Sequence, residues 1–255
     1  MKQCIWCKQT EKDKQFNTKA HSIPKSLGGK KISPNVCDDC NHYFGIHKKG
    51  LPSVELALKE AFTISRVMFL HTKGEIGKNK ILPKVTSFYF DINITKWTVK
   101  PKIAYRLQSG FLHGVGRQFK RGVFKMFLEE TDRVNKNGLN SKFDFIREFA
   151  RYDLADYPVF YFHRAHAVIL YDELLRDPQI HFEKGFPGKW IVNELGFFEF
   201  ELLGHVFGIP TSREYYLFLE QYINNSLREK KESFKGVAEI KKFTDMDITL
   251  RFLKD

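Results

Sequence analysis

Long apolar segments are missing from this chain of 255 residues. No run of about 18 or more uncharged apolar residues occurs, so we expect no membrane-spanning helix. The residues from Met1 to Cys4 show no apolar core of a secretion signal. Internal repeats and low-complexity tracts are absent too. With 42% hydrophobic and 15% aromatic residues, the chain has enough apolar material for a real core. We therefore expect a folded protein of a reducing, cytoplasmic compartment.

Cysteine is scarce, with four residues in all. They form two Cys-x-x-Cys pairs, Cys4 with Cys7 and Cys37 with Cys40. Two such pairs about 30 residues apart are the ligand set of a tetrahedral structural Zn²⁺ site. Two disulfides are the alternative, but disulfides persist mainly in secreted proteins. We predict that zinc pins the residues between the pairs as one small loop.

Arginine is missing from residues 1–50, which hold ten lysines and four acidic residues. This segment therefore carries half of the net charge of +12 in a fifth of the chain. A basic cluster of this kind is typical of a surface that binds a polyanion such as nucleic acid. A lysine surface that merely aids solubility is the alternative.

The patterning predicts an α+β protein with three parts. They are a compact zinc-bound module at 1–50, a helical linker at 51–82, and a larger α+β domain of unknown type at 83–255, with a polar connector at 74–83. The glycine pair Gly28-Gly29 favours a hairpin-like turn within 16–36. Helices are predicted after Cys40 and at 53–70, 115–135, 142–152 and 212–231, and strands at 86–94, 97–107, 159–171, 190–206 and 247–252.

Residues 4–47 resemble the HNH endonuclease family, in the subgroup whose ββα-metal motif is bracketed by a four-cysteine zinc knuckle. The resemblance rests on both cysteine pairs, on His-x-Ile-Pro-Lys-Ser-Leu-Gly-Gly from His21, and on Asn-Val-Cys-x-x-Cys-Asn from Asn35 to Asn41. It covers under a fifth of the chain. It implies two strands and a helix around one catalytic divalent ion, separate from the zinc, and hydrolysis of phosphodiesters.

The resemblance also implies roles for three residues. His21 matches the general base that takes a proton from the attacking water, which suits an imidazole with an ordinary pKa of about 6.5. Asn35 matches the residue that orients this imidazole. Asn41 matches a ligand of the catalytic ion, Mg²⁺ or Mn²⁺, because hard cations prefer such an oxygen. The alternatives are an ordinary buried histidine at 21, a turn cap at 35 and a helix cap at 41.

The chain departs from the family pattern at Ala20. Many relatives place Asp or Glu immediately before the catalytic histidine as a second ligand of the ion. Without this carboxylate, we expect the ion to be held by Asn41, phosphate and water, and to bind weakly when DNA is absent. Other possible ligands follow nearby in the sequence: Asp38, Asp39, His42 and His47.

Basic residues supply candidates for DNA contacts. In the module these are Lys25, Lys30, Lys31 and Lys48. In the helix predicted at 115–135, a basic stripe at helical spacing comprises Arg117, Lys120, Arg121 and Lys125, of which we select Arg117 and Arg121. Solvated charges on an ordinary amphipathic helix are the alternative.

These features favour a metal-dependent DNA endonuclease of the HNH type. A role in restriction or phage defence fits a small stand-alone nuclease by analogy. The larger domain offers possible surfaces for a homodimer. Two alternatives stay open: an inactive zinc-containing module that only binds nucleic acid, and a nuclease that is silent until the larger domain binds a small effector.

Overall fold

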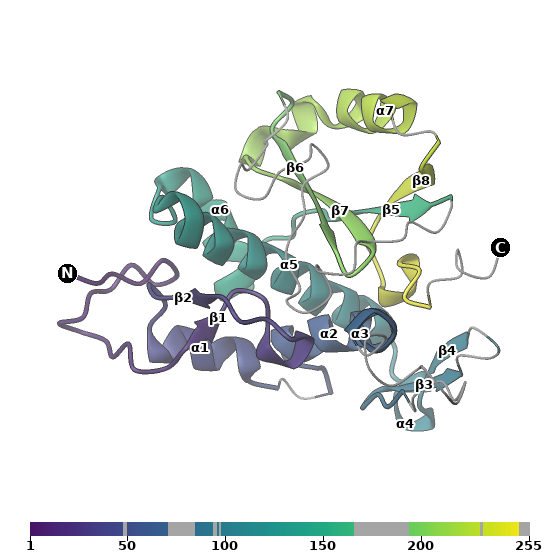
Figure 1. Ribbon diagram of the computed structural model, residues 1–255, viewed down its shortest axis with the longest axis horizontal. Helices are drawn as coiled ribbons and strands as arrows, with labels where there is room; N and C mark the ends of the chain where they lie inside the picture. The colour runs from purple at the N-terminus through teal and green to yellow at the C-terminus, as the bar shows by residue number, and fades with distance from the viewer. Residues whose placement is uncertain are drawn as a thin grey trace.

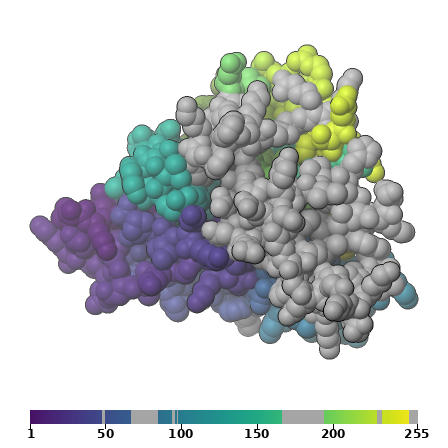
Figure 2. Space-filling model, in the orientation of Figure 1, coloured from purple at the N-terminus to yellow at the C-terminus, as the bar shows by residue number. Residues whose placement is uncertain are grey.

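The computed structural model describes residues 1–47, 50–70, 85–93, 96, 98–165, 194–229 and 232–249. The fold is α+β, as predicted: a small N-terminal module, a long central helix and a four-stranded antiparallel sheet. The central helix α5 (Phe111–Asn135) lies between the N-terminal module and the sheet (Figure 1). In the space-filling view, the purple N-terminal residues form one end of the visible face (Figure 2).

The N-terminal module contains two short strands and a helix. In chain order, its elements are β1 (Ala20–His21), the 3₁₀ turn η1 (Lys25–Leu27), β2 (Ile32–Ser33) and α1 (Asp38–Gly45). The strands pair antiparallel, with Ala20 opposite Ser33 and His21 opposite Ile32. The hairpin and the helix after Cys40 are therefore confirmed.

The helix predicted at 53–70 is present but interrupted. Ser53 caps its start, since the Ser53 hydroxyl accepts a hydrogen bond from Leu56 N at 3.1 Å. The segment then forms two helices, α2 (Val54–Ala61) and α3 (Thr63–Leu70). They meet at Phe62, whose buried ring packs against Phe119 and Phe207. Tertiary packing at this position accounts for a break that helical periodicity does not reveal.

A second hairpin follows, made of β3 (Phe90–Asn93) and β4 (Thr98–Pro101). The strand predicted at 97–107 is wrong beyond Pro101, because the chain turns into the short helix α4 (Ile103–Arg106). Proline lacks the N–H group that a continuing strand would need, so its position at the end of β4 is consistent with this change.

Helix α5 begins one turn before its predicted start. Gly110 caps it with a left-handed backbone, φ 76°. Its first turns contain two further glycines, which lower helix propensity and hide the start. A Cβ at Gly114 would lie 2.6 Å from the Leu51 side chain, and a Cβ at Gly116 would lie 3.0 Å from the Lys242 backbone. Close packing therefore requires both glycines.

The helix predicted at 142–152 is a succession of three tight turns. These are the 3₁₀ turn η2 (Ser141–Phe143), α6 (Asp144–Ile146) and the π-helical turn η3 (Arg147–Arg151). The helix predicted at 212–231 likewise divides into the 3₁₀ segment η5 (Arg213–Leu217) and α7 (Leu219–Glu229).

The sheet has the strand order β6-β7-β5-β8. Its strands are β5 (Phe160–Arg164), β6 (Phe197–Leu202), β7 (His205–Pro210) and β8 (Phe234–Glu239). The single strand predicted at 190–206 is wrong, because the chain reverses at Leu203 and Gly204, where φ is 49° and 81°. Two successive positive φ values are the geometry of a tight hairpin turn.

Two further strand predictions fail around this sheet. Strand β8 is not among the predicted strands, and residues 247–249 form no strand, with a turn at 248–249, although the sequence predicts a strand at 247–252. The rest of that segment, together with 166–171 and 190–193 of two other predicted strands, lies outside the described residues. The short 3₁₀ segment η6 (Phe243–Asp245) follows β8 and packs its Phe243 ring on Phe90.

One buried apolar cluster runs through the molecule. It includes Phe44 of α1, Leu58 of α2, Phe119 of α5 and Phe207 of β7. The connector predicted at 74–83 lies outside the described residues, and the division at residues 50 and 82 stays a prediction. Among the described helices, none is long and apolar enough to cross a bilayer.

Candidate metal centre and catalytic site

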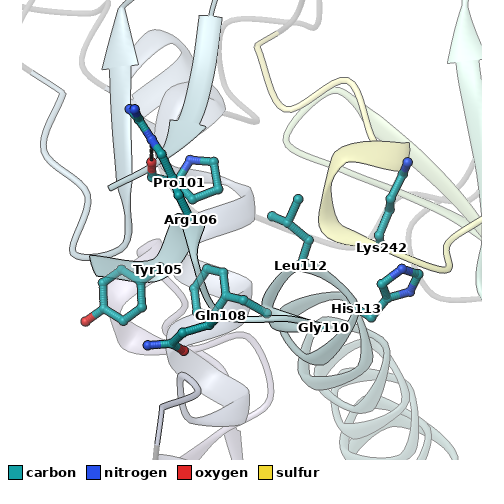
Figure 3. Close-up of a pocket in the computed structure, with 9 residues that line it drawn as sticks. Pro101, Tyr105, Arg106, Gln108, Gly110, Leu112, His113 and Lys242 are labelled. Atoms are coloured by element: carbon teal, nitrogen blue, oxygen red, sulfur yellow. Dashed lines mark hydrogen bonds between the residues drawn. The ribbon is translucent and has the colours of Figure 1, made fainter. Parts of the chain in front are cut away.

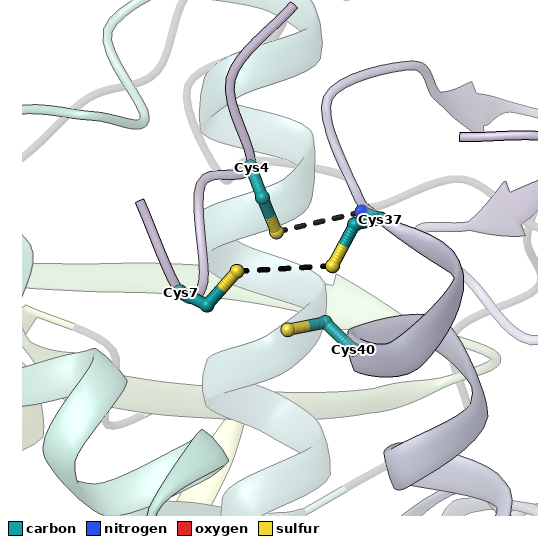
Figure 4. A group of neighbouring side chains, drawn as sticks. All are labelled: Cys4, Cys7, Cys37 and Cys40. Atoms are coloured by element: carbon teal, nitrogen blue, oxygen red, sulfur yellow. Dashed lines mark hydrogen bonds between the residues drawn. The ribbon is translucent and has the colours of Figure 1, made fainter. Parts of the chain in front are cut away.

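The four cysteines converge from two separate segments (Figure 4). Cys4 and Cys7 lie in the N-terminal loop, while Cys37 caps α1 and Cys40 lies in its first turn. Their sulfur atoms all lie within 4.8 Å of one another, and the Sγ atoms of Cys7 and Cys37 are 3.7 Å apart. Tetrahedral zinc with Zn–S bonds of about 2.3 Å separates its sulfurs by about 3.8 Å. All four thiols are free, which contradicts the disulfide alternative.

The electrostatics of the cluster also fit a cation. The Cys40 thiol donates to the Cys4 sulfur, which lowers the pKa of Cys4 to about 5. The same hydrogen bond, followed by burial, raises the pKa of Cys40. Crowded sulfurs therefore cannot all ionise unaided, whereas a metal ion deprotonates coordinating thiols. Arg151 adds a positive group, donating from Nε to Cys40 Sγ at 3.3 Å. The cluster thus suits zinc.

The β1–β2 hairpin has one covered face and one open face. Ala20 and Ser33 are buried, whereas His21 is half-buried and its partner Ile32 is 39% exposed. This follows from the alternation of side chains along paired strands. The hairpin turn also requires its glycine pair: Gly28 has φ 93°, and a Cβ at Gly29 would overlap the Ile23 carbonyl oxygen. His21 is therefore presented on the open face.

Two hydrogen bonds hold His21. Its Nδ1 lies 3.0 Å from the carbonyl oxygen of Lys19. A carbonyl only accepts hydrogen bonds, so Nδ1 carries the proton in this contact and Nε2 of the neutral ring is free to accept one. The backbone carbonyl of His21 itself accepts from Lys125 Nζ at 3.0 Å. Both the ring and the backbone of His21 are therefore fixed.

Asn41 is held close to the same strand. Its Nδ2 donates to Thr18 Oγ1 at 3.1 Å, and Thr18 donates its N–H and its hydroxyl to Asp38 Oδ1, each at 2.8 Å. The Thr18 N–H is the main reason why the pKa of Asp38 is lowered. Because the amide nitrogen of Asn41 makes the contact with Thr18, its oxygen is the atom suited to a cation. Asn41 and His21 are thus tethered to the consecutive residues Thr18 and Lys19.

Asn35 does not make the contact predicted for it. Its Nδ2 donates to Asp132 Oδ2 of α5 at 2.9 Å, and its carbonyl oxygen accepts from Ile5 N at 2.9 Å. The imidazole is instead held by the Lys19 carbonyl. The contacts of Asn35 therefore fasten the loop before Cys37 to α5 and to the first cysteine loop.

The acidic groups near the motif are used elsewhere. Ala20 is fully buried, so a carboxylate at this position would lie inside the structure. Asp39 forms an ion pair with Lys14 at 2.7 Å, and Asp38 is engaged by Thr18 as described above. His42 and His47 are exposed. Within the described residues, the cysteines form the one cluster of metal-ligating groups.

Helix α5 packs against the N-terminal module and hydrogen-bonds to it. The sequence did not predict these contacts. Trp6 Nε1 donates to Glu129 Oε1 at 3.0 Å, and the Ser22 hydroxyl donates to Glu130. Glu129 is fully buried and also accepts from Lys125 at 2.9 Å. These acids reach the cysteine loop and the residue that follows β1 from more than 100 residues away in the sequence.

This packing overturns the basic stripe predicted on α5. Arg121 is fully buried and donates to the carbonyl of Ala150 and to Tyr43, so a phosphate cannot reach it, and its selection as a DNA contact is wrong. Lys120 and Lys125 are also buried. The Arg117 side chain is 32% exposed and pairs with Asp153 at 3.1 Å.

The predicted lysines of the module lie on its surface. Lys25, Lys30 and Lys31 are exposed around the hairpin turn, and Lys19 is exposed beside His21. Lys48 lies outside the described residues. The exposed basic surface near His21 is therefore formed by the hairpin. The buried cations of α5 do not contribute to it.

A separate cavity of about 190 Å³ lies at the start of α5 (Figure 3). Its lining includes Tyr105, Arg106, His113 and Lys242, and none of the predicted site residues. Ligand pockets usually exceed about 300 Å³. Its size therefore does not favour the alternative of a small effector bound at this place.

Residues 4–49 match a family model described as HNH endonuclease. The match contains all four cysteines together with His21, Asn35 and Asn41. No curated protein and no solved structure matches the chain.

Proposed function

We propose that this protein, whose residues 4–49 match an HNH endonuclease family model, is a metal-dependent DNA endonuclease. The observation that carries the proposal is the hydrogen bond from His21 Nδ1 to the Lys19 carbonyl on the open face of the hairpin. It leaves Nε2 as the proton acceptor, which is the state that a general base needs. The surrounding exposed lysines suit a polyanionic substrate.

In the proposed reaction, Nε2 of His21 takes a proton from a water molecule as its oxygen attacks the phosphorus atom. The bond between phosphorus and the leaving oxygen then breaks, and that oxygen keeps the bonding electron pair and takes a proton from solvent water. The amide oxygen of Asn41 is the group that would hold Mg²⁺ or Mn²⁺, with the remaining positions left to phosphate and water. When bound, such an ion neutralises charge on the phosphate and on the leaving oxygen. Lys25, Lys30 and Lys31 bind neighbouring phosphates.

Zinc has a structural role in this proposal. Cys37 precedes the helix that carries Cys40 and Asn41, and the sequence between the cysteine pairs contains His21. Coordination of the four thiolates would fix the start of α1 relative to the hairpin. Structural zinc sites supply folding free energy directly, so loss of the ion would displace both proposed catalytic residues.

The test is cleavage of supercoiled plasmid by the purified protein with Mg²⁺ or Mn²⁺, compared with buffer that lacks either ion. We expect His21→Ala to lower the rate by about 10²- to 10⁴-fold, the usual contribution of a general base. His113→Ala is the matched control, because His113 is exposed at the start of α5. Equal cleavage by the parent and His21→Ala would overturn the proposed role of His21.

A second candidate is a module that binds nucleic acid without cutting it. The buried Ala20 favours it, because no carboxylate stands at the position of the second ion ligand. This candidate predicts that the parent and His21→Ala both bind DNA and that neither cleaves plasmid, with Mg²⁺, with Mn²⁺ or without either ion. Roles in restriction or phage defence, and a homodimer, stay predictions.

A further inference from the structure

Lys125 lies in the middle of α5 and is fully buried. Its ammonium group lies 3.0 Å from the His21 carbonyl oxygen, 2.9 Å from Glu129 Oε2 and 3.4 Å from Glu55 Oε1. A lysine has three N–H donors, and here three oxygens surround them. Although burial alone would lower the pKa of Lys125, the carboxylates of Glu129 and Glu55 raise it. The group is therefore charged and fully engaged.

The same ammonium group connects the parts of the N-terminal module. It contacts β1 through the His21 carbonyl, and it lies 5.5 Å from the centre of the Phe44 ring in α1. Its partner Glu129 accepts the hydrogen bond from Trp6, which lies between the first two cysteines. The pair of Lys125 and Glu129 thus contacts β1, the α1 helix and the cysteine loop.

Lys125 contacts the backbone carbonyl of His21, which belongs to the peptide group directly after the His21 Cα atom. Fixing this carbonyl restricts the backbone torsion of His21, and so the direction in which its side chain leaves the strand. The Lys19 carbonyl fixes the other end, the ring. Displacement of a catalytic group by about 1 Å can cost about 100-fold in rate, so the orientation of this residue is worth holding at both ends.

We propose that Lys125 is a positioning residue for His21, holding the backbone of the general base from the far side of the hairpin. This inference rests on the proposed function, since it assigns His21 a catalytic task. Lys125 is fully buried, so it contacts neither substrate nor solvent, and it can influence the reaction only through the residues that it holds.

Removing Lys125 alone would leave Glu129 buried without its cation, which is strongly destabilising. The informative variant is therefore the double substitution Lys125→Met with Glu129→Gln. It removes the two fully buried charges, and the glutamine oxygen can still accept from Trp6 Nε1. The remaining partner, Glu55, has a side chain that is 32% exposed, so water can solvate its carboxylate. Replacing a whole buried ion pair in this way is often neutral for stability. Lys120→Met is the matched control, because Lys120 is a buried lysine of the same helix whose ammonium group pairs with Asp156.

Three measurements are made on each full-length protein: kcat and KM for plasmid cleavage, the melting temperature, and the ¹⁵N signals of the histidine rings. For the double variant we expect kcat to fall by about 10- to 100-fold, with KM and melting temperature close to the parent values. The ¹⁵N signals of the His21 ring should also change, from those of one tautomer with the proton on Nδ1 to those of a mixture of tautomers. Lys120→Met should match the parent in kcat and in the His21 signals.

If the parent cleaves and the folded double variant has the same kcat, the inference is overturned. If the parent itself does not cleave, the proposed function fails and the ring signals decide this inference separately. An unaltered His21 pattern in the double variant then refutes the positioning role. Should the double variant fail to fold, Lys125→Arg provides the same comparison, since it keeps the charge but not the geometry of the ammonium group.

Discussion

The amide of Asn35 donates to the carboxylate of Asp132 at 2.9 Å, across 97 positions of the sequence. Asp132 also accepts from the backbone N–H of Gly138 at 3.1 Å, so it joins the loop before Cys37 to the end of α5. The residue that family resemblance assigns to orienting the imidazole thus has a clear structural partner.

This pair is open to a double-mutant cycle with Asn35→Ala and Asp132→Ala. We expect each change to lower the free energy of unfolding, and the two to be coupled by about 0.5–3 kcal/mol, because each removes the same partly buried hydrogen bond. Urea unfolding of the four proteins measures this. Strict additivity of the two changes would show that the hydrogen bond contributes nothing to stability.

Zinc content gives the second prediction. We expect about one zinc ion per chain by elemental analysis, and its loss in Cys40→Ser. Removal of the ion by a chelator should lower the melting temperature, since zinc binding contributes about 10–16 kcal/mol in small zinc-dependent peptides. The cysteine thiols should react with a thiol reagent only after chelation, and added zinc should reverse both effects. Zinc-free protein with full stability and reactive thiols would refute the metal centre.

The third prediction concerns the lysines of the hairpin. Replacing Lys25, Lys30 and Lys31 by alanine should weaken DNA binding and reduce the salt dependence of the affinity. The slope of log K against log salt concentration should shrink by about 0.9 for each phosphate that the variant no longer neutralises. An equal loss of charge elsewhere, at the exposed Lys96, Lys100 and Lys241, is the control and should leave the slope unchanged. Equal slopes in both triple variants would place the DNA on another surface.

The fourth prediction is the pH dependence of stability at His205. This side chain is fully buried, with Nε2 2.5 Å from Ser65 Oγ and Nδ1 3.0 Å from the Tyr161 hydroxyl. Burial, followed by the charge of Arg164, lowers the pKa of His205 to about 3. An unfolded histidine titrates near pH 6.5, so between these values only the unfolded chain gains the proton. The contribution to stability is therefore complete above pH 6.5 and is lost as the pH falls toward 3.

The slope should reach about 1.4 kcal/mol per pH unit from this one group. His205→Gln should remove that part of the slope in urea unfolding between pH 5 and 7.5. His113→Gln serves as the comparison, since His113 is exposed and should leave the slope as in the parent. Identical slopes for all three proteins would show that His205 does not resist protonation.

The sequence predicted the parts of the site that depend on local spacing. The cysteine pairs, His21 and the hairpin glycines all fall within the first 40 residues, and the structure brings the four sulfurs together as expected. The role of α5 could not be found in this way. Arg121 and Lys125 occur among apolar residues at helical spacing, which is also the pattern of surface charges. Their partners are distant in the sequence: Arg121 donates to the Ala150 carbonyl, and Lys125 contacts His21 and Glu55.

The sheet shows the same limit. Tight hairpin turns are usually signalled by Asn-Gly or Asp-Gly. Here the turn is Leu203-Gly204. Because Leu203 is apolar although its φ is positive, the two strands read as one continuous apolar segment of the sequence. Strand β8 carries Lys235 and Gly236, which weaken its pattern, and pairing with β5 determines its conformation.

The burial of α5 against the hairpin bears on how far the module can be transplanted. A fragment ending at residue 50 would lack Lys125, Glu129, Glu130 and Asp132, and would leave Trp6, Ser22 and Asn35 without their hydrogen-bond partners on α5. Grafting the four-cysteine segment onto another protein would therefore need a replacement for this helix. In this chain, the segment most similar to known nucleases depends for its shape on a helix that its own motif does not contain.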